Sequence, residues 1–147
     1  MNYTLEIEIN APIHKVVELF DDRNNIHHWQ PNLIRFEAIS GNPGELGAET
    51  KLIYKMGNKE VEMIEVITVN QLPTKHSGVY ETSNVWNLVE NSFIEVDPIT
   101  TRWICKNQFK CSGFVKLIAM LMPTVFKQQS IKYMQQFKVF AEAQTFP

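Results

Sequence analysis

Three glutamates in one short stretch, Glu60, Glu62 and Glu65, are the most obvious group of carboxylates that could do chemistry. Two carboxyl groups held close together can serve as general acid and general base. Glu60 and Glu62 fall on one side of an extended strand, whereas Glu65 has the opposite parity. We therefore expect a solvated strand edge here and no catalytic pair.

The histidines and cysteines offer no metal-ligand spacing. His27 and His28 are adjacent and would point in different directions from a short helix, and His14 and His76 lie far away in the sequence. Cys105 could be a nucleophile only if His76 reached it across a sheet, and a free cysteine in a strand is usually a small core residue. We expect no catalytic residue, no metal and no cofactor.

The parity of the last predicted strand, residues 101–111, indicates which of its side chains point inward. The positions that must face water carry basic or amide groups: Arg102, Lys106, Gln108 and Lys110. The alternate positions then face the interior: Trp103, Cys105, Asn107, Phe109 and Cys111. Asn107 is therefore expected to be an inward amide.

A three-residue loop at 97–99 would bring two more amides to the same face. The strand partners would be Phe93 with Trp103, Asn91 with Cys105, Val89 with Asn107 and Asn87 with Phe109. An unsatisfied buried amide costs about 1 to 3 kcal/mol, so three of them favour a pocket over a dry core. A register shifted by one residue would instead send Asn87 and Asn91 to solvent and leave Asn107 with a backbone partner.

Aromatic and methionine side chains suit the walls of such a pocket, although any one of them could equally fill a core. The residues that we expect to bind a ligand are Trp29, Tyr54, Met63, Tyr80, Asn87, Asn91, Phe93, Trp103, Asn107, Phe109, Phe114, Leu117 and Leu121.

Hydrophobic period and turn residues predict the elements that position these side chains. Residues 3–9 alternate as a strand, and Asn10 is the expected N-cap of a helix over 12–20. A second short helix is expected over 22–29, capped by Asp21 or Asp22 and ended by Pro31. Six further strands follow with short links, which predicts an antiparallel sheet: 33–40, 48–54, 60–70, 75–82, 85–96 and 101–111.

After Gly113 the period becomes helical, and we expect one amphipathic helix over residues 113–143 with a kink at Pro123. About 31 residues at helical rise span roughly 46 Å, so this helix must cross the whole sheet.

Composition limits the class of protein. The 147 residues suit one domain, and a net charge of -2 with 20% charged residues gives no reason to expect a nucleic-acid partner. The apolar run 117–122 is far shorter than the roughly 20 residues that cross a bilayer, so we expect no stable membrane insertion and a cytoplasmic location. Cys105 and Cys111 would lie about 20 Å apart on one strand and remain free thiols.

Charge is distributed unevenly along the chain. Residues 1–100 carry 7 Lys+Arg and 15 Asp+Glu, whereas residues 101–147 carry 7 and 1. One interpretation is a basic surface for membranes or nucleic acid. The interpretation that we favour is cross-strand pairing of Glu6 and Glu8 with Lys106 and Lys110, if the first and last strands are neighbours.

Several short stretches resemble one superfamily in order and spacing. They are Ile9-Asn10-Ala11-Pro12 followed by Val16 and Phe20, then His28-Trp29-Gln30-Pro31, Gly44 to Gly47, Thr100-Thr101-Arg102, and Ser112-Gly113. The chain resembles the START-like, birch-pollen-allergen-like (SRPBCC) superfamily over nearly its whole length, closest to bacterial polyketide cyclase/dehydrase-like members. The resemblance implies an α+β helix-grip fold in one domain over residues 1–147. An antiparallel seven-stranded curved sheet would wrap around a long C-terminal helix, with two short helices after the first strand.

The resemblance also implies a cavity between sheet and long helix, with residues 117–122 as a movable wall. The first functional hypothesis is noncatalytic binding of a lipid, isoprenoid or aromatic metabolite. It is favoured because no inward Asp, Glu or Lys can be assigned. The second is a cyclase/dehydratase-like enzyme that uses Asn107, Tyr80, His76 or Asn91. The third is a protein-interaction module like the heat-shock ATPase activators, which would use Trp86, Leu88 and Ile94. Monomer and homodimer both remain open.

Overall fold

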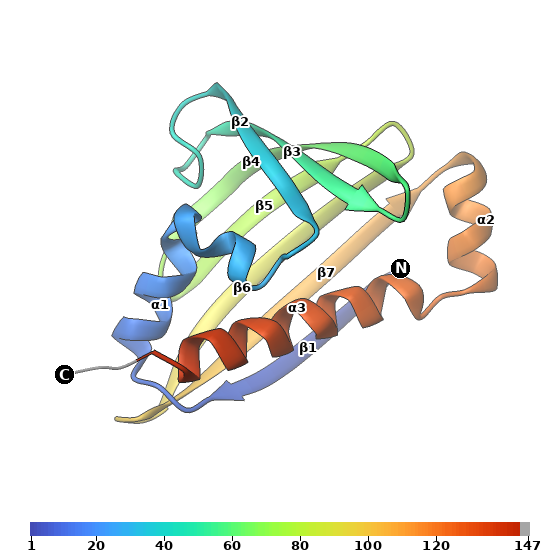
Figure 1. The fold of residues 1–147 in the computed structure, drawn as a ribbon. Helices are drawn as coiled ribbons and strands as arrows, with labels where there is room; N and C mark the ends of the chain where they lie inside the picture. Colours follow the sequence, from blue (N-terminus) through green and yellow to red (C-terminus); the bar gives the residue numbers. More distant parts are fainter. Residues whose placement is uncertain (145–147) are drawn as a thin grey trace.

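The computed structural model describes residues 1–144, whose strands form one antiparallel sheet in the order β1-β7-β6-β5-β4-β3-β2. The elements are β1 (Asn2–Ile9), α1 (Ile13–Asp21), the 3-10 helix η1 (Arg23–His28), β2 (Leu33–Ser40), β3 (Glu49–Met56), β4 (Lys59–Gln71), β5 (Lys75–Glu81), β6 (Val85–Asp97), β7 (Thr100–Cys111), α2 (Gly113–Leu121) and α3 (Val125–Glu142). The sheet curves around α3, and α1 and η1 cover one end of it (Figure 1). The α+β helix-grip fold is thus confirmed.

The C-terminal helix differs from the prediction, because it is two helices and not one kinked helix. Met122 leaves the helical region with φ -133° and ψ 66°, directly before Pro123. Pro123 cannot donate to the carbonyl of Ala119, and its ring clashes with that carbonyl, so the helix ends here. Only α3, with 18 residues, lies across the sheet. α2 stands at a steep angle to it at the far end of the molecule (Figure 1).

The two N-terminal helices are present, but the cap of the first was predicted wrongly. Pro12 occupies the N-cap position of α1, and no side chain caps that helix. Asn10 instead donates from its backbone N–H and its side-chain Nδ2 to the carboxylate of Glu142, each at 3.3 Å. Asp22 does cap η1, because its Oδ1 accepts from the N–H of Asn24 at 2.9 Å.

The predicted register of β6 against β7 is confirmed at all four pairs, including Asn87 with Phe109 and Asn91 with Cys105. The alternative register is therefore wrong. Two alternating strands joined by a tight turn allow few pairings that keep both apolar faces buried.

Strands β1 and β7 are neighbours, as the charge pattern suggested, but the expected ion-pair partners are wrong. Glu8 pairs with Arg102 at 3.2 Å, and Glu6 lies opposite Ile104. Lys106 lies opposite Thr4, and Lys110 covers the ring of Trp86 with its ammonium 4.8 Å from the centroid. The Glu8–Arg102 pair is exposed, so its contribution to stability is about 1 kcal/mol or less.

A cluster of aromatic rings closes one end of the space between sheet and α3. The ring of Phe20 from α1 lies 5.0 to 5.9 Å, between centroids, from those of Trp29, His76, Phe93, Trp103 and Phe137. The inward side of the C-terminal half of α3, with Met134, Phe137 and Ala141, is buried in this cluster, so this end is a packed core.

Candidate functional site

A cavity of about 400 Å³ lies between the concave face of the sheet and the N-terminal half of α3. This volume falls within the range of small-molecule sites, and most of the wall is apolar. Phe20 and Trp29 bound its closed end. Met56, next to the β3–β4 turn, and Val115 of α2 bound the other end. The interior is therefore not filled by the protein's own side chains.

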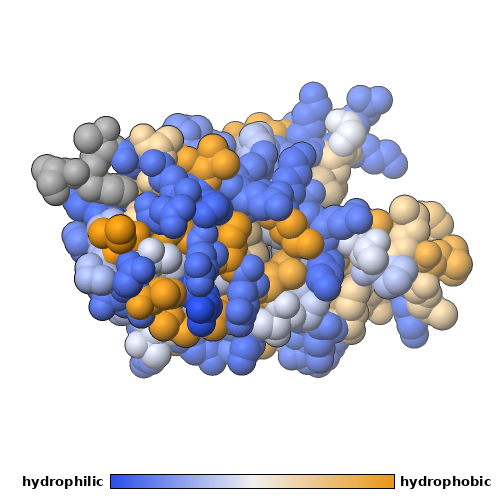
Figure 2. Space-filling view, turned by 90° about the horizontal axis from the view of Figure 1, so that it is seen from below, coloured by the Kyte–Doolittle hydropathy of each residue, from blue (hydrophilic) through white to orange (hydrophobic). Residues whose placement is uncertain are grey.

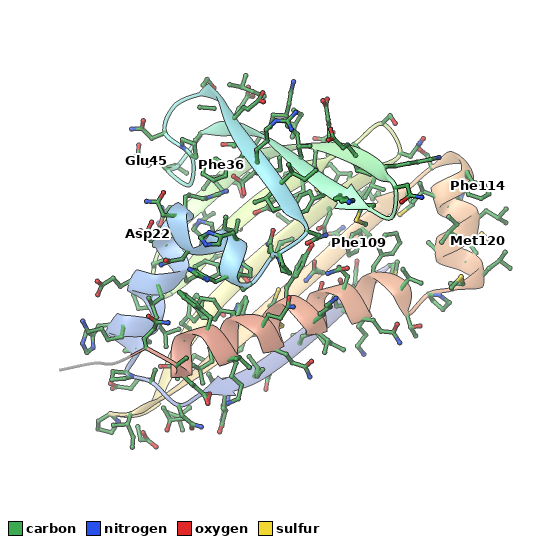
Figure 3. All side chains as sticks on the ribbon, viewed as in Figure 1. Asp22, Phe36, Glu45, Phe109, Phe114 and Met120 are labelled. Carbon is green, nitrogen blue, oxygen red and sulfur yellow. The ribbon has the colours of Figure 1, made fainter. Side chains whose placement is uncertain are left out.

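Nine of the thirteen residues predicted to bind a ligand line this cavity: Trp29, Tyr54, Met63, Tyr80, Asn87, Asn91, Trp103, Asn107 and Phe109. Phe109 extends from β7 into the space between sheet and α3 (Figure 3). Their contact with a ligand remains a prediction, whereas their position at the wall is a feature of the fold.

The other four predicted residues do not line the cavity. Phe93 packs behind the wall against Trp103, with 5.7 Å between ring centroids. Phe114, Leu117 and Leu121 lie on the outer side of α2, and Phe114 points away from the sheet (Figure 3). The break at Pro123 turns α2 outward. Segment 117–122 is therefore not a wall of the cavity, and Val115 alone of the described α2 residues contributes to it.

Two of the three inward amides, Asn87 and Asn107, form a hydrogen-bonded polar strip across β6 and β7, and Asn91 makes a separate bond. Asn87 donates to Asn107 Oδ1 at 3.3 Å and to the carbonyl of Gln108 at 3.2 Å. Asn107 donates to the Cys105 sulfur at 3.2 Å. Asn91 accepts from the Trp103 indole N–H at 2.9 Å. Asn107 thus bonds to side chains and not to the backbone, and the strip has a fixed orientation before any ligand enters.

A buried ion pair between Arg23 and Glu65 is the most important feature that sequence reasoning missed. The Glu65 side chain is only 2% exposed, and its Oε1 accepts from Arg23 Nη2 at 2.5 Å. The expectation of a solvated strand edge is therefore wrong for Glu65. The expectation that no acidic side chain points inward is wrong as well, because Glu65 lines the cavity. It shares the inward face of β4 with Val61 and Met63, which also line the cavity. This parity was the available signal, but Arg23 comes from η1, and no local pattern connects the two.

Burial and the ion pair determine the charge state of this end of the cavity. Burial alone would lower the pKa of Arg23, but Glu65, together with smaller contributions from Tyr80 and Tyr54, offsets this effect and the pKa is raised. Burial and then the charge of Arg23 lower the pKa of His76, so its imidazole is neutral at pH 7. Burial raises the pKa values of Tyr54 and Tyr80, which keeps both phenols protonated. The Tyr54 hydroxyl donates to Gln30 at 2.6 Å.

Three buried polar atoms of cavity-lining residues have no hydrogen-bond partner within residues 1–144. They are Arg23 Nη1, Trp29 Nε1 and His76 Nδ1. Two of these are obligate N–H donors, and leaving such a group unpaired costs about 1 to 3 kcal/mol. An oxygen acceptor placed at this end of the cavity would satisfy these two donors.

The Gly41–Gly47 loop supports the same end from outside. Gly44 has a φ of +91° and lines the cavity, and a Cβ added there would lie 3.2 Å from Arg23 Nε. Only glycine allows the loop to pack this closely against the guanidinium without strain. The loop is a hairpin connection, as its composition predicts, and it also holds Arg23 in place.

Cys105 does not have the environment of a nucleophile. Burial raises the pKa of its thiol to about 11, so the thiolate is scarce at neutral pH. Cys105 and Cys111 are both free. Among the described residues, no three His, Cys, Asp or Glu side chains gather closely enough to hold a metal ion.

Replacing His76 by glutamine is expected to weaken the acid sensitivity of the fold. The folded-state pKa of His76 is lowered, so between about pH 6.5 and that lower value the unfolded chain binds a proton that the folded chain does not. Stability is therefore lost as pH falls through this window, by at most about 1.4 kcal/mol per pH unit. Urea unfolding of wild type and His76→Gln at several pH values measures the difference. Equal pH slopes would contradict the prediction.

The outer face of β6 does not present the predicted interaction residues as one exposed patch. Trp86 lies under Lys110, Leu88 is half-buried, and Ile94 alone of the three is largely exposed, at 45%. Glu90 lies between Leu88 and Ile94 and pairs with Lys75 at 2.6 Å. Across residues 1–144, no helix combines the length and hydrophobicity required to span a membrane.

Comparisons with known proteins agree with this geometry. The sequence matches the family described as "Polyketide cyclase / dehydrase and lipid transport" over residues 1–138. A search of curated proteins finds no significant match.

Three solved structures illustrate the shared fold. The Zhui aromatase/cyclase from Streptomyces sp. R1128 has a TM-score of 0.77 at 11% identity, covering 97% of this chain and 93% of that one. A START superfamily protein from Mycobacterium smegmatis has a TM-score of 0.76 at 11% identity, covering 98% and 99%. Norcoclaurine synthase from Thalictrum flavum, in complex with dopamine and hydroxybenzaldehyde, has a TM-score of 0.70 at 13% identity, covering 99% and 89%. At these identities the likeness concerns the fold.

Proposed function

Because the chain belongs to the polyketide cyclase/dehydrase and lipid transport family, we propose that it binds a small hydrophobic or amphipathic molecule between the sheet and α3. One observation carries the proposal: a cavity of about 400 Å³ with apolar walls has unpaired N–H donors at its closed end. An empty apolar cavity lowers stability, and an unpaired buried donor lowers it further. A bound molecule would relieve both costs.

The residues that line the cavity indicate which chemical groups the ligand carries and where. Leu52, Val61, Met63 and Phe109 give apolar contact along its length. Arg23 and Trp29 offer N–H donors at the closed end, where the ligand would place a carbonyl, hydroxyl or acidic oxygen. The amide strip of Asn87 and Asn107 provides a second polar position on the sheet side. An isoprenoid, fatty acyl or aromatic molecule with one oxygen-bearing end fits this arrangement.

Native mass spectrometry of freshly purified protein is expected to show a copurifying apolar molecule. The molecule found should raise the melting temperature, and a free concentration of about 100 times its Kd would stabilise the fold by about 2.7 kcal/mol. Val89, opposite Asn107 on the cavity wall, is the position to block. Val89→Trp should lose the adduct. Val139→Trp is the matched control, because Val139 is 71% exposed on α3 outside the cavity.

Wild-type protein that is uniformly empty, and that shows no thermal shift with a panel of lipids and aromatic metabolites, would refute binding. Cooperative unfolding of Val89→Trp must be verified, since overpacking costs about 1 to 3 kcal/mol even in a folded protein.

A second candidate function is catalysis in the same cavity, and His76 is the observation that favours it. His76 is buried and neutral, it lines the cavity, and its Nδ1 has no partner among the described residues. A neutral imidazole beside a positioned substrate can accept a proton. The aromatase/cyclase and the norcoclaurine synthase share this fold. If the isolated ligand is turned over, His76→Gln and Tyr80→Phe should lower kcat more than they raise KM.

A further inference from the structure

The short helix α2 carries a set of exposed apolar side chains that neither the cavity nor the core uses. Their exposed fractions are 72% for Phe114, 48% for Leu117, 71% for Met120 and 73% for Leu121, and Met122, directly after the helix, is 56% exposed. At 3.6 residues per turn, Phe114, Leu117 and Leu121 fall on one side of the helix. In the space-filling view, α2 is the lobe at the right of the picture, and its tip is hydrophobic (Figure 2). An apolar surface of this kind marks an interaction site.

The groups around this lobe are mainly basic. Residues 98–141 contain no Asp or Glu. Lys110 at the end of β7, Lys116 on α2 and Lys127 at the start of α3 are exposed. The N-terminal ammonium lies at the same end, because it donates to the carbonyl of Phe109 at 3.1 Å.

Two carboxylates lie on the neighbouring strand ends. Glu60 faces Lys55 across β3 and β4, and Glu81 ends β5. These two charges are outnumbered by the lysines and the ammonium, so the lobe combines exposed apolar side chains with a positive surround.

We propose that α2 docks on the surface of an anionic lipid bilayer. Phe114, Met120 and Leu121 would enter the boundary between headgroups and acyl chains, while Lys116 and Lys127 would contact lipid phosphates. A helix of nine residues is about 14 Å long, so it lies in the interface and does not cross it.

The charge pattern favours this partner over a second copy of the chain. A symmetric dimer through α2 would bring Lys116 and Lys127 of both copies together. The residues from 98 to 141 offer no carboxylate to oppose them. An anionic lipid surface supplies the opposite charge and an apolar layer at once.

Docking would also place one end of the cavity at the bilayer. Val115 lines the cavity, and Phe126, in the first turn of α3, lines it from the same side. The proposal concerns the outer face of α2 and holds whether or not the cavity carries a ligand. It can therefore be tested separately from the proposed function.

Flotation of the full chain with lipid vesicles tests the proposal. Wild type should float with vesicles of phosphatidylcholine and phosphatidylglycerol, and bind vesicles of phosphatidylcholine alone far more weakly. Met120→Ser with Leu121→Ser should lower the partition coefficient at least about tenfold. Lys116→Gln with Lys127→Gln should lower it about fivefold for each lysine, and added salt should have the same effect.

The matched control is Ile99→Ser, which changes an equally exposed apolar residue, 70% exposed, in the β6–β7 turn. It should float like wild type. Vesicle binding that is absent, that ignores lipid charge, or that survives the α2 double substitution overturns the proposal. A dimer that Met120→Ser with Leu121→Ser dissociates, measured by sedimentation without lipid, overturns it in favour of a second copy.

A fluorescent cavity probe separates this result from the proposed function. All α2 variants should bind 1-anilinonaphthalene-8-sulfonate (ANS) like wild type, because Met120, Leu121 and Lys116 do not line the cavity. Lost flotation with retained probe binding identifies α2 as the docking element. Joint loss of flotation, probe binding and cooperative unfolding overturns that assignment, since the substitutions would then act through the fold.

Discussion

Glu65→Ala is expected to lower the free energy of unfolding by about 3 to 5 kcal/mol, because it leaves a buried cation without its partner. Arg23 donates to Glu65 at 2.5 Å, and their side chains are only 17% and 2% exposed. The guanidinium cannot lose its proton, so the variant must either keep a poorly solvated charge or expose Arg23 by moving η1. Urea unfolding at pH 7 measures the loss.

A surface pair of the same chemistry is the control for this experiment. Arg35 and Glu37 are 3.2 Å apart and about half exposed, at 50% and 52%. Glu37→Ala should therefore change stability by less than about 1 kcal/mol. If Glu65→Ala costs no more than Glu37→Ala, the Arg23–Glu65 pair is solvated in practice, and its assignment to a buried end of the cavity is wrong.

The double substitution Arg23→Met with Glu65→Leu separates the charge from the packing. Removing both ions together avoids the unpaired charge, so the double variant should be close to wild type in stability. The coupling free energy from the four proteins then measures the pair directly. Additive losses would contradict the interpretation that the two residues act as one unit.

Local patterns were sufficient to predict the sheet. Alternating residues and short turns identified each strand within two residues of its observed ends. The pairing of β6 with β7 was also predicted, although the loop has two residues and not three. Asp97 pairs with Thr100, and a register shift between Glu95 and Asp97 gives the predicted partner of each amide. These features depend on residues close in sequence, where the period of two and the turn geometry leave few choices.

Features that depend on distant residues were not predicted. Nothing near Glu65 indicates that Arg23 will lie beside it, because η1 reaches β4 only after the sheet has curved. The parity of β4 was the one available signal, because it places Glu65 on the same face as Val61 and Met63, which also line the cavity.

The direction of α2 was also beyond local reasoning. Pro123 correctly marked an interruption, but a kink and a complete break look alike in sequence. The difference decides whether Phe114 and Leu121 line the cavity or face outward. The spacing of Phe114 and Leu121 is typical of a helix packed on a core, but both side chains are exposed. This difference is the reason for assigning them to an external interaction surface.

Two probes that share an aromatic body are expected to respond differently when Arg23 is removed. ANS carries a sulfonate, and N-phenyl-1-naphthylamine lacks it. Hydrogen bonds to a charged group contribute about 1.5 to 3 kcal/mol. Arg23→Met with Glu65→Leu should therefore weaken ANS binding by about tenfold to a hundredfold, and change binding of the uncharged probe by less than about threefold.

This comparison isolates the hydrogen-bonding role of Arg23 from net charge and from cavity shape. Arg23→Met with Glu65→Leu removes one charge of each sign, so a loss of ANS affinity reports the guanidinium donors and not the overall potential. Arg35→Met with Glu37→Leu makes the same chemical change on an exposed pair and should leave both probes unaffected. If both probes weaken together, the cavity has collapsed. If neither weakens, the unpaired Arg23 Nη1 does not face the bound molecule, and the closed end of the cavity does not select for an oxygen-bearing ligand.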